Sequence, residues 1–526
     1  MKKTFLTLLA CLGLVLTGSQ AVFAAEEDNY LRVGMEAAYA PFNWTQNDDA
    51  NGAAPIEGTN QYANGYDVQI AKKIAESMGK ELLVVKTEWD GLVPALTSNK
   101  IDMIIAGMSP TEERKKEIAF SDSYYTSEPV IMVRKDGDFA SAKSVSDFSG
   151  AKVTAQQGVW HVNLLSQMPG IEPQTPMGDF SQMRQALESG IIDAYISERP
   201  EGTTAENANP SFKMLTLSEG FEVSESDAAI AVGMRKDDNR ISEVNQVLAT
   251  ISEDDRIALM DDMISKQPVE EESDDSAKPS FFSQVATILK TNWREFLVGT
   301  GTTLLISITG TICGLLIGLL IGIFRTAPKA ANRITAIAQK VFGWFLSVYI
   351  EVFRGTPMIV QSMVIYYGTA QAFNINIPRL WAAIFIVSIN TGAYMSEVVR
   401  GGIFAVDKGQ FEAATALGFT HGQTMRKIVL PQVIRNILPA TGNEFVINIK
   451  DTSVLNVISV VELYFSGKTV ATQNYQYFQT FTIIATIYFV LTFTVTRILR
   501  YLEKRMDSDH YTTGANQMQI KEVTHV

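Results

Sequence analysis

The pattern of apolar and polar positions divides the chain into two unlike halves. Between residues 29 and 266, short β-rich apolar runs alternate with amphipathic stretches, a pattern typical of an α/β domain. After Ser280 the apolar runs lengthen, and residues 296–324 contain no charged side chain. A bilayer core requires only ~20 such residues. We therefore expect an α/β domain followed by an all-α membrane domain.

The first half predicts strands and at least one amphipathic helix. The helix is expected over residues 67–78, with Asp67 as its N-cap and an apolar stripe that begins at Val68. Residues 46–65 are rich in Asn, Asp, Gly and Ala, and we expect a mobile loop there. The expected strands cover residues 31–35, 82–85, 103–105, 130–133 and 228–234.

The second half predicts five membrane-spanning helices. Clusters of Arg and Lys follow the first, third and fifth apolar runs, and the positive-inside rule places these clusters in the cytoplasm. An odd number of spans then leaves the α/β domain outside the cell. The expected spans are residues 296–324, 342–371, 380–399, 438–461 and 478–499, of which the second and fourth contain charged residues.

Four glycines in the first span recur at every fourth position. Gly310, Gly314, Gly318 and Gly322 form one stripe without side chains, where another helix can approach closely. We expect a helix interface within the bundle or dimer, the alternative being glycines that face lipid.

Charge is distributed as unevenly as hydropathy. Residues 26–280 hold 45 acidic and 22 basic residues, a net charge of −23, whereas residues 281–526 hold 12 and 20, a net charge of +8. With 46% hydrophobic residues among 526, the chain is neither disordered nor a basic nucleic-acid binder. Cys11 and Cys313 lie in apolar runs and the four histidines are scattered, so neither a disulfide framework nor a metal site is predicted.

The N-terminus and the junction between the halves have their own signatures. Residues 1–24 combine Lys2 and Lys3, an apolar run and small residues before a cleavage point, which predicts a signal peptide; an uncleaved anchor is the alternative. Residues 267–280 are acidic and contain two prolines, as expected of an extended tether. The remaining segments are a membrane domain over residues 281–505 and a cytoplasmic tail over residues 506–526.

Several motifs of the first half occur in the order of a known family. The motifs are Gly34-Met35-Glu36-Ala37-Ala38-Tyr39-Ala40-Pro41-Phe42, Gly65-Tyr66-Asp67-Val68, Trp89-Asp90-Gly91-Leu92, Ser109-Pro110-Thr111-Glu112-Glu113-Arg114 and Phe120-Ser121-Asp122. They resemble the polar amino acid binding proteins of bacterial ABC importers. This resemblance implies a two-lobed periplasmic-binding-protein fold (type II), with lobe 1 at about 30–125 and 228–266, lobe 2 at about 126–227, and crossing segments near residues 124–133 and 221–231.

The resemblance assigns residues to the backbone end of an amino acid ligand. Arg114 is expected to bind the α-carboxylate through two parallel donors, with Ser109 and Thr111 adding further donors. Glu198 stands where the family carries the acid that accepts from the α-ammonium group. Without the resemblance, Arg114 belongs to a charge run typical of a solvated helix face.

The side-chain end of the ligand is assigned in the same way. Tyr39 and Trp89 match the family's two stacking aromatics, and Glu36 faces the distal tip. Aromatic faces and an acid favour a cationic tip. His161 disfavours one if it is protonated, and it is among the positions where this sequence departs from the family, which are Ala106, Gly107, Gln156, Val159 and His161.

The second half contains a motif of its own. Glu412-Ala413-Ala414 is followed by Gly418 and, after a spacer, by Pro431. This resembles the EAA loop of ABC importer permeases, here about residues 401–435, which couples an ATPase to the membrane helices. We expect a short helix over residues 411–417 that Gly418 ends and a return to the membrane at Pro431; a surface helix of other purpose is the alternative.

Charged residues inside the expected spans need partners. Glu397 and Arg400 are one helical turn apart and are expected to pair. Lys450 and Asp451 interrupt an apolar run, and together with Glu397 they are candidates for the translocation path, with structural bracing as the alternative.

Some required parts are missing from the chain. No Gly-x-x-x-x-Gly-Lys-[Ser/Thr] occurs, so ATP and Mg are expected to be used by separate ABC ATPase subunits, and this chain is expected to bind no cofactor. One five-span domain supplies half of a pathway, which calls for a second permease domain, as a homodimer or with a similar permease.

Together these features predict an importer of a polar, cationic L-amino acid of the lysine or arginine type. The chain is expected to be a transporter subunit and not an enzyme. We expect a multi-pass protein among the lipids of the cytoplasmic membrane of a Gram-positive type envelope, with its binding domain outside. The alternatives are a glutamine or histidine importer, and, from other classes, a ligand-gated channel, a sensory receptor or a cell-wall enzyme with the same two-lobed fold.

Overall fold

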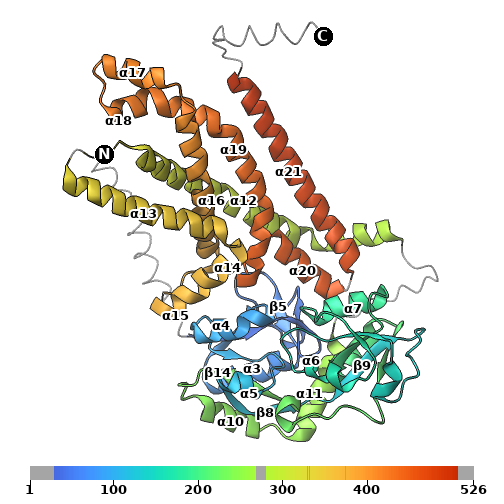
Figure 1. Ribbon diagram of the computed structural model, residues 1–526. Coiled ribbons are helices and arrows are strands. Elements are labelled where there is room, and N and C mark those ends of the chain that lie inside the picture. Colours follow the sequence, from blue (N-terminus) through green and yellow to red (C-terminus); the bar gives the residue numbers. More distant parts are fainter. Residues whose placement is uncertain are drawn as a thin grey trace.

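The computed structural model describes residues 29–507, except 268–279, 329, 331, 374 and 475. The expected signal peptide and nearly all of the tether and tail lie outside these residues. Two parts are visible in Figure 1: a two-lobed α/β part (residues 29–267) and a helical part (residues 280–507) that stands above it.

Lobe 1 is built on a five-stranded sheet in the order β6-β1-β7-β14-β8. β1 is parallel to both β6 and β7, whereas β14 is antiparallel to its neighbours. Parallel strands at the start of the chain agree with the α/β pattern of the sequence. The bounds are β1 Tyr30–Met35, β6 Glu81–Lys86, β7 Met103–Ile104, β8 Ala119–Thr126 and β14 Ala229–Met234, and the helices are η2 Ala50–Gly52, α3 Tyr66–Ser77, η3 Trp89–Gly91, α4 Leu92–Thr97, α5 Glu112–Lys115, α10 Ile241–Ala249 and α11 Glu253–Lys266.

Helix α3 buries its apolar stripe against the sheet as expected, but its predicted N-cap is wrong. The N-cap is Gly65, and Asp67 lies inside the first turn. The Asp67 carboxylate is buried, and it accepts hydrogen bonds from Tyr124 Oη at 2.7 Å and Asn43 Nδ2 at 2.8 Å. The local sequence pattern assigns this carboxylate to helix capping, but in the folded chain it binds Tyr124 and Asn43 instead.

The expected mobile loop at residues 46–65 is also wrong. It contributes β4 and β5 to a four-stranded sheet in the order β2-β3-β5-β4. Ala54, Ile56 and Ala63 are buried, and Ile56 pairs with Val84 of β6. Alternate small apolar residues thus attach this segment to lobe 1. The strands are β2 Ala38–Tyr39, β3 Asn43–Gln46, β4 Ala54–Pro55 and β5 Tyr62–Asn64.

Lobe 2 contains the second five-stranded sheet, in the order β11-β10-β12-β9-β13. The chain passes from lobe 1 to lobe 2 between β8 and β9, and it returns through α9 into β14. The bounds are β9 Pro129–Arg134, β10 Lys152–Thr154, β11 Glu172–Pro173, β12 Ala194–Glu198 and β13 Phe212–Leu215, with η4 Val145–Phe148, α6 His161–Leu164, η5 Leu165–Gln167, α7 Phe180–Glu188, α8 Arg199–Ala208 and α9 Glu225–Ala228.

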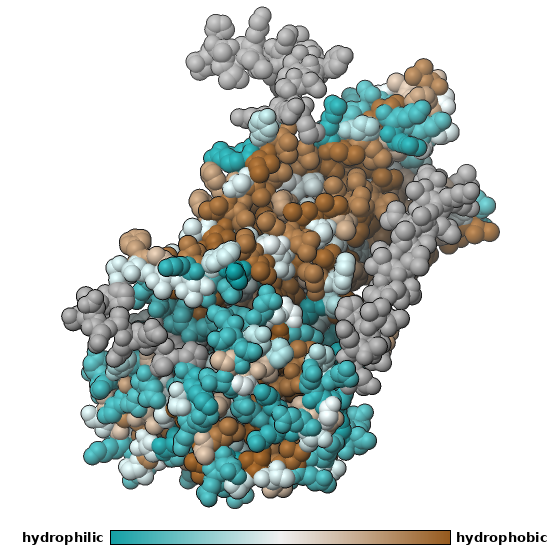
Figure 2. Space-filling view, turned by 180° about the vertical axis from the view of Figure 1, so that it is seen from behind, coloured by the Kyte–Doolittle hydropathy of each residue, from teal (hydrophilic) through white to brown (hydrophobic). Residues whose placement is uncertain are grey.

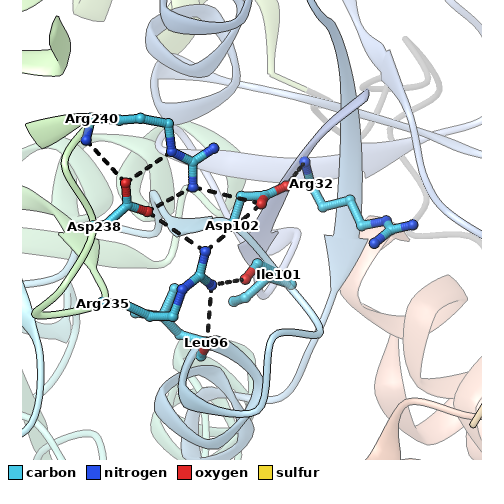
Figure 3. A network of polar contacts seen from close by, with 7 residues as sticks. All are labelled: Arg32, Leu96, Ile101, Asp102, Arg235, Asp238 and Arg240. Carbon is cyan, nitrogen blue, oxygen red and sulfur yellow. Dashed lines mark hydrogen bonds and ion pairs between the residues drawn. The ribbon is translucent and has the colours of Figure 1, made fainter. Parts of the chain in front are cut away.

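A polar network fastens the returning chain to lobe 1 (Figure 3). Asp238 accepts from Arg240 Nε at 2.9 Å, and its second oxygen lies 2.6 Å from Arg240 Nη2. Arg235 donates to the carbonyl of Ile101 at 2.8 Å, while Asp102 accepts from the backbone of β1. The segment after β14 therefore belongs to lobe 1, although lobe 2 separates the two in sequence.

The helical part has four helices long and apolar enough to cross a membrane, or five if one bent pair counts as a single span. The four are α12 Phe281–Thr326, α13 Arg333–Gly355, α16 Arg379–Phe404 and α21 Tyr477–Asp507. The bent pair joins a helix over His421–Ile458 to α20 Leu463–Asn474 at 58°. Figure 2 shows the apolar surface of this part between polar surfaces at both ends.

Two of the expected spans have wrong bounds. The second ends at Gly355, where Thr356 and Pro357 break the helix, and α14 Met358–Met363, η6 Val364–Gly368 and α15 Thr369–Phe373 follow as separate turns. The fourth starts far earlier than residue 438 and is bent, because the helix from His421 continues to Ile458 before the break that precedes α20.

The glycine stripe lies against α16, as expected of an interface within the bundle. A Cβ added to Gly310, Gly314, Gly318 or Gly322 would come within 2.5–2.6 Å of an atom of α16. The four neighbours are Val387, Thr391, Met395 and Val399, which are themselves four residues apart. The backbones of α12 and α16 approach this closely only because the stripe has no side chains.

The segment with the EAA motif lies at the end of the helical part farthest from the α/β part (Figure 1). α17 Lys408–Ala416 is followed by Gly418 with φ +79, a conformation that favours glycine. The expected return at Pro431 is wrong: the helix starts at His421, capped by Thr420, and runs as α18 His421–Thr424, η7 Met425–Val429, α19 Leu430–Asp451 and η8 Thr452–Ile458. Pro431 is accommodated within it, directly after the π-helical turn η7.

Candidate functional site

The two lobes face each other with the carboxyl ends of their parallel strands. In lobe 1, Glu36 follows β1, Trp89 follows β6 and Ser109 follows β7. In lobe 2, Gln156 follows β10 and Glu198 ends β12. Ligands of α/β sheets bind at this edge. The lobes are closed on each other, since the free space between them is about 10 Å³, roughly the room that one water needs.

Arg114 is oriented by backbone carbonyls from both lobes. Its Nη1 donates to Ser109 O at 2.9 Å, and its Nη2 donates to Gly158 O of lobe 2 at 2.9 Å. Its guanidinium lies 5.0 Å from the centre of the Trp89 ring. Burial lowers the pKa of Arg114 to about 10, so the side chain stays charged at neutral pH. The pocket therefore holds a fixed cation.

Glu198 and His161 are buried beside each other. His161 Nε2 lies 3.7 Å from Glu198 Oε1. Both imidazole nitrogens are buried without a hydrogen-bond partner, whereas the hydroxyls of Tyr39 and Ser127 lie close enough to the Glu198 carboxylate to oppose the rise of its pKa. Orphaned buried polar atoms cost free energy and mark sites where a further polar group binds.

Burial shifts the titration of both side chains toward the neutral form. Burial first, and Arg114 second, lower the pKa of His161 to about 3, so the imidazole is neutral at physiological pH. Burial raises the pKa of Glu198 to about 7. A neutral His161 does not repel a cationic ligand, so the repulsion expected of a protonated His161 does not arise.

Glu36 is buried at another wall of the pocket, among further carboxylates. Burial raises its pKa to about 8, and the nearby Asp179 and Glu88 add to the shift, while Lys468 and a hydrogen bond with Gln156 oppose it. Glu36 is 9% exposed. A positive charge placed beside this side chain is therefore stabilised by the surroundings.

Four aromatic side chains line the same space: Tyr39, Trp89, Trp160 and Phe180. The ring of Tyr39 stacks on Phe42 at 4.9 Å and on Phe180 of lobe 2 at 4.8 Å between centroids. Trp89 Nε1 donates to Gly158 O at 3.3 Å, across the cleft. Gly107 has φ +63, and a Cβ there would lie 2.7 Å from the ring of Tyr39. The position of this ring therefore requires glycine at residue 107.

Seven of the eight residues expected from the sequence line one pocket. Thr111 is the exception: it lies outside the lining, and its hydroxyl caps α5 by accepting from the backbone of Arg114. Trp160 and Phe180 of lobe 2 were not predicted. Trp160 directly precedes α6 and Phe180 is the first residue of α7, and no local pattern marks either as a pocket residue. The lining consists of Glu36, Tyr39, Trp89, Gly107, Ser109, Arg114, Gln156, Val159, Trp160, His161, Phe180 and Glu198.

Glu397 lies at the end of α16 and pairs with Arg400, as expected. Arg400 donates to Glu397 Oε2 from Nη2 at 2.7 Å, and Arg325 of α12 pairs with the other oxygen. Lys450 and Asp451 are exposed at the end of α19. The charge of Glu397 is therefore satisfied within the bundle, whereas Lys450 and Asp451 are exposed.

Lobe 1 is in direct contact with the helical part. Lys86 Nζ donates to Thr469 Oγ1 at 2.9 Å, and Arg379 Nη2 lies 3.4 Å from Glu57 Oε2. The ammonium of Lys100 lies 4.1 Å from the centre of the Tyr366 ring. Burial at this contact lowers the pKa of Lys86 to about 7.

Comparison with known proteins identifies both parts separately. Residues 31–263 match the bacterial extracellular solute-binding proteins, family 3, and residues 333–508 match the binding-protein-dependent transport system inner membrane component. The glutamine transport system permease protein GlnP of Escherichia coli (strain K12) is 39% identical over 178 residues, which are 33% of this chain and 81% of that protein.

Two further relatives cover one part each. The arginine transport system permease protein ArtQ of Bacillus subtilis (strain 168) is 38% identical over 168 residues, 32% of this chain and 77% of that protein. An amino acid ABC transporter substrate-binding protein from Streptococcus pneumoniae, solved with L-arginine, is 25% identical with a TM-score of 0.41, over 47% of this chain and 98% of that one.

The fold and the pocket define a solute-binding domain joined to a membrane permease in one polypeptide. The chain belongs to the bacterial amino acid ABC importers, with a family 3 solute-binding domain fused to a binding-protein-dependent permease domain. It is a transporter subunit, and its homologues are amino acid permeases, which replaces the channel, receptor and cell-wall enzyme alternatives.

Proposed function

We propose that the chain imports a cationic L-amino acid of the arginine or lysine type. The observation that carries this proposal is the environment of Glu36, whose pKa is raised to about 8 by burial and by Asp179 and Glu88. Glu36 lines the closed pocket, and Glu88 and Asp179 lie behind it, paired with Lys468. A ligand that brings its own positive charge stabilises the ionised form of this buried carboxylate.

The other end of the pocket fits the groups that all amino acids share. Arg114 supplies a fixed guanidinium for the α-carboxylate, with Ser109 beside it. The buried Glu198 accepts from the α-ammonium group, and the neutral His161 adds no competing charge. Thr111 acts indirectly, by holding the helix turn that contains Arg114.

A glutamine ligand is the second candidate, and one observation favours it. With a pKa of about 8, Glu36 is largely protonated at neutral pH, and a protonated carboxyl both donates and accepts, as a carboxamide does. The related permeases are named for glutamine and for arginine, so both ligand types occur among the relatives.

Transport requires partners that bind at the opposite end of the helical part. The Glu412-Ala413-Ala414 helix α17 is the proposed coupling element, since Ala414 is buried while Leu417 is 76% exposed and available to a groove on an ATPase. ATP and Mg act on that partner. A second copy of this chain completes the pathway, and the exposed Lys450 and Asp451 line it or brace it, whereas the doubly paired Glu397 acts as a brace.

The proposed topology follows from the same arrangement. The α/β part lies outside the cytoplasmic membrane, and α17 lies in the cytoplasm at the other end of the helices (Figure 1). The acidic tether keeps the receptor at high effective concentration above its permease. Such a fusion suits a Gram-positive type envelope, from which a free binding protein would diffuse away.

Calorimetric titration of the full chain in lipid nanodiscs tests the ligand. L-arginine, L-lysine, L-histidine, L-glutamine and L-glutamate are compared, and we expect arginine or lysine to bind most tightly. Arg114→Ala is expected to weaken every ligand by at least about 150-fold, since two charge-assisted hydrogen bonds of about 1.5–3 kcal/mol each are lost. Tightest binding of glutamine selects the second candidate, and tightest binding of glutamate contradicts the role of Glu36.

A further inference from the structure

Helix α20 lies at the end of the helical part that faces the α/β part, and buried hydrogen bonds hold it in place. Glu462 is fully buried and accepts hydrogen bonds from the backbone of Tyr464 at 3.0 Å and Phe465 at 2.7 Å, which satisfies the first turn of α20. Tyr488 Oη donates to the same carboxylate at 3.0 Å, and Thr303 Oγ1 accepts from the backbone of Leu463 at 3.2 Å. The side chains of α20 therefore have fixed positions relative to the membrane helices.

Lys468 of this helix contacts both lobes at once. Its ammonium lies 2.7 Å from Glu88 Oε2 in lobe 1 and 3.4 Å from Asp179 Oδ2 in lobe 2. The Lys468 side chain is 17% exposed and that of Asp179 only 7%, so solvent screens these contacts weakly. One cation of the helical part thus bridges two acids that the chain places on different lobes.

Lobe 2 also borders the helical part, because its Arg184 and Phe212 line one cavity with Gln284 and Tyr477. Three further contacts of this interface involve lobe 1: Lys86, Glu57 and Lys100 contact Thr469, Arg379 and Tyr366 respectively. A movement of lobe 2 relative to lobe 1 leaves them in place. It separates Asp179 from Glu88, however, so a single ammonium can no longer satisfy both carboxylates.

We propose that Lys468 makes docking sensitive to closure of the cleft, by bridging Glu88 and Asp179 only when the two lobes are together. Lobe 1 holds the α/β part on the helical part, and the contact between Lys468 and Asp179 depends on the position of lobe 2. The inference rests on the proposed import function for its purpose, but the bridge itself is a feature of the closed, docked chain.

Closure and docking are then thermodynamically linked. A ligand that closes the cleft strengthens the bridge, and the bridge in turn stabilises the ligand-bound form by the same factor. Removing the Lys468 charge is therefore expected to weaken ligand binding by the full chain, even though Lys468 is absent from the pocket lining.

The test compares Lys468→Met with a matched control in the full chain in nanodiscs. Lys290→Met removes the same charge from an exposed position near the start of α12. We expect Lys468→Met to weaken L-arginine binding by about 5- to 30-fold, within the usual range of coupling between sites, and Lys290→Met to have no effect. Lys468→Arg retains a cation of similar reach and is expected to restore most of the affinity.

Double variants test whether both lobes take part. Glu88→Gln and Asp179→Asn each remove one acid, and asparagine still caps α7 as Asp179 does through its 2.9 Å bond from Gln182 N. Each is expected to weaken binding in the wild-type background and to have much less effect in the Lys468→Met background. Full additivity of either acid with Lys468 overturns the bridge.

Two outcomes separate this inference from the proposed function. If the wild-type chain binds no amino acid of the panel, the proposed function fails. Amide hydrogen exchange without ligand then tests the bridge. Faster exchange of α20 in Lys468→Met than in Lys290→Met supports the bridge, and equal exchange overturns it. If the chain binds L-arginine, or another amino acid of the panel used in its place, unchanged or tighter binding by Lys468→Met overturns the bridge. Tighter binding makes Lys468 a competitor of the cationic ligand.

Discussion

At the residue scale, the pocket combines acids held near their neutral form with one fixed cation. Burial raises the pKa of Glu36 to about 8 and that of Glu198 to about 7, whereas Arg114 remains charged. In the closed cleft without ligand, protons therefore occupy sites that a cationic ligand is expected to take over. Binding and proton release are linked for this reason.

The pH dependence of binding is expected to distinguish arginine from glutamine. Because the pKa of Glu36 is raised from 4.5 to about 8, the closed ligand-free form binds more protons than an open form, and its stability falls as pH rises through this window. A cationic tip favours the ionised carboxylate, so the affinity for L-arginine relative to L-glutamine is expected to rise with pH up to about 8, by at most about tenfold per pH unit. Calorimetry at pH 6, 7 and 8 measures this ratio.

Glu198 affects both ligands equally, so the ratio isolates Glu36. Glu36→Gln is expected to flatten it, whereas Glu76→Gln, an exposed acid on α3, is expected to leave it unchanged. A ratio in the wild-type chain that does not vary with pH would contradict the assignment of Glu36 to the ligand tip.

The pocket could be predicted from the sequence only where its residues follow strands within recognisable motifs. Glu36 directly follows β1, and Trp89 and Ser109 lie in the loops that follow β6 and β7, within motifs that predicted their places. Phe180 reaches the pocket because α7 packs across β12, and this depends on the arrangement of lobe 2 and not on any local pattern. Thr111 lies outside the lining because its hydroxyl caps α5, and the local sequence of a capping hydroxyl does not differ from that of a ligand-binding one.

At the scale of elements, close contact between α12 and α16 organises the helical part. The glycine stripe brings α16 within reach of the α12 backbone, and the buried Asn448 of α19 donates to Thr311 at 2.9 Å and to Thr391 at 3.0 Å in the same region. Three helices are thus joined by close packing and by polar contacts inside an apolar bundle.

Substitution of the central glycine is expected to separate these helices. In Gly314→Val the new Cβ would lie 2.6 Å from Thr391 Cβ, and overpacking of this kind destabilises by about 1–3 kcal/mol. Gly301→Val is the matched control, since a Cβ at this position of the same helix meets nothing within 4 Å. Thermal unfolding followed by tryptophan fluorescence measures both, and equal midpoints would contradict the packing role.

The boundaries of the membrane helices were the least predictable elements. Hydropathy averaged over the segment joined the apolar residues on either side of Arg354-Gly355-Thr356-Pro357 into one expected span, whereas α13 ends at Gly355. It also could not show the bend between η8 and α20, because the break depends on Ser459 in a left-handed conformation and on the buried Glu462. Backbone conformation and tertiary hydrogen bonds decided both boundaries.

At the scale of the whole molecule, the helical part is one half of a symmetric assembly in our proposal. Lys450 and Asp451 are adjacent and exposed at the end of α19. In a two-fold interface the lysine of one copy can face the aspartate of the other, and each pair occurs twice. This would satisfy charges that an apolar surface otherwise leaves exposed.

The solubilised chain is therefore expected to have about twice its single-chain mass of 57.9 kDa in native mass spectrometry. Lys450→Glu places like charges together and is expected to shift the population toward single chains, while Lys450→Glu combined with Asp451→Lys restores the pair and the dimer. A single-chain mass for the wild type, or dimers unaffected by Lys450→Glu, would contradict this arrangement.

The contacts that hold lobe 1 on the helical part have a consequence for the rate at which ligand is captured. The contacts of Lys86, Glu57 and Lys100 do not involve lobe 2, so in our proposal lobe 2 opens and closes while lobe 1 stays on the helical part. We then expect capture to be a unimolecular movement of one lobe, whose rate does not depend on how many copies the membrane holds.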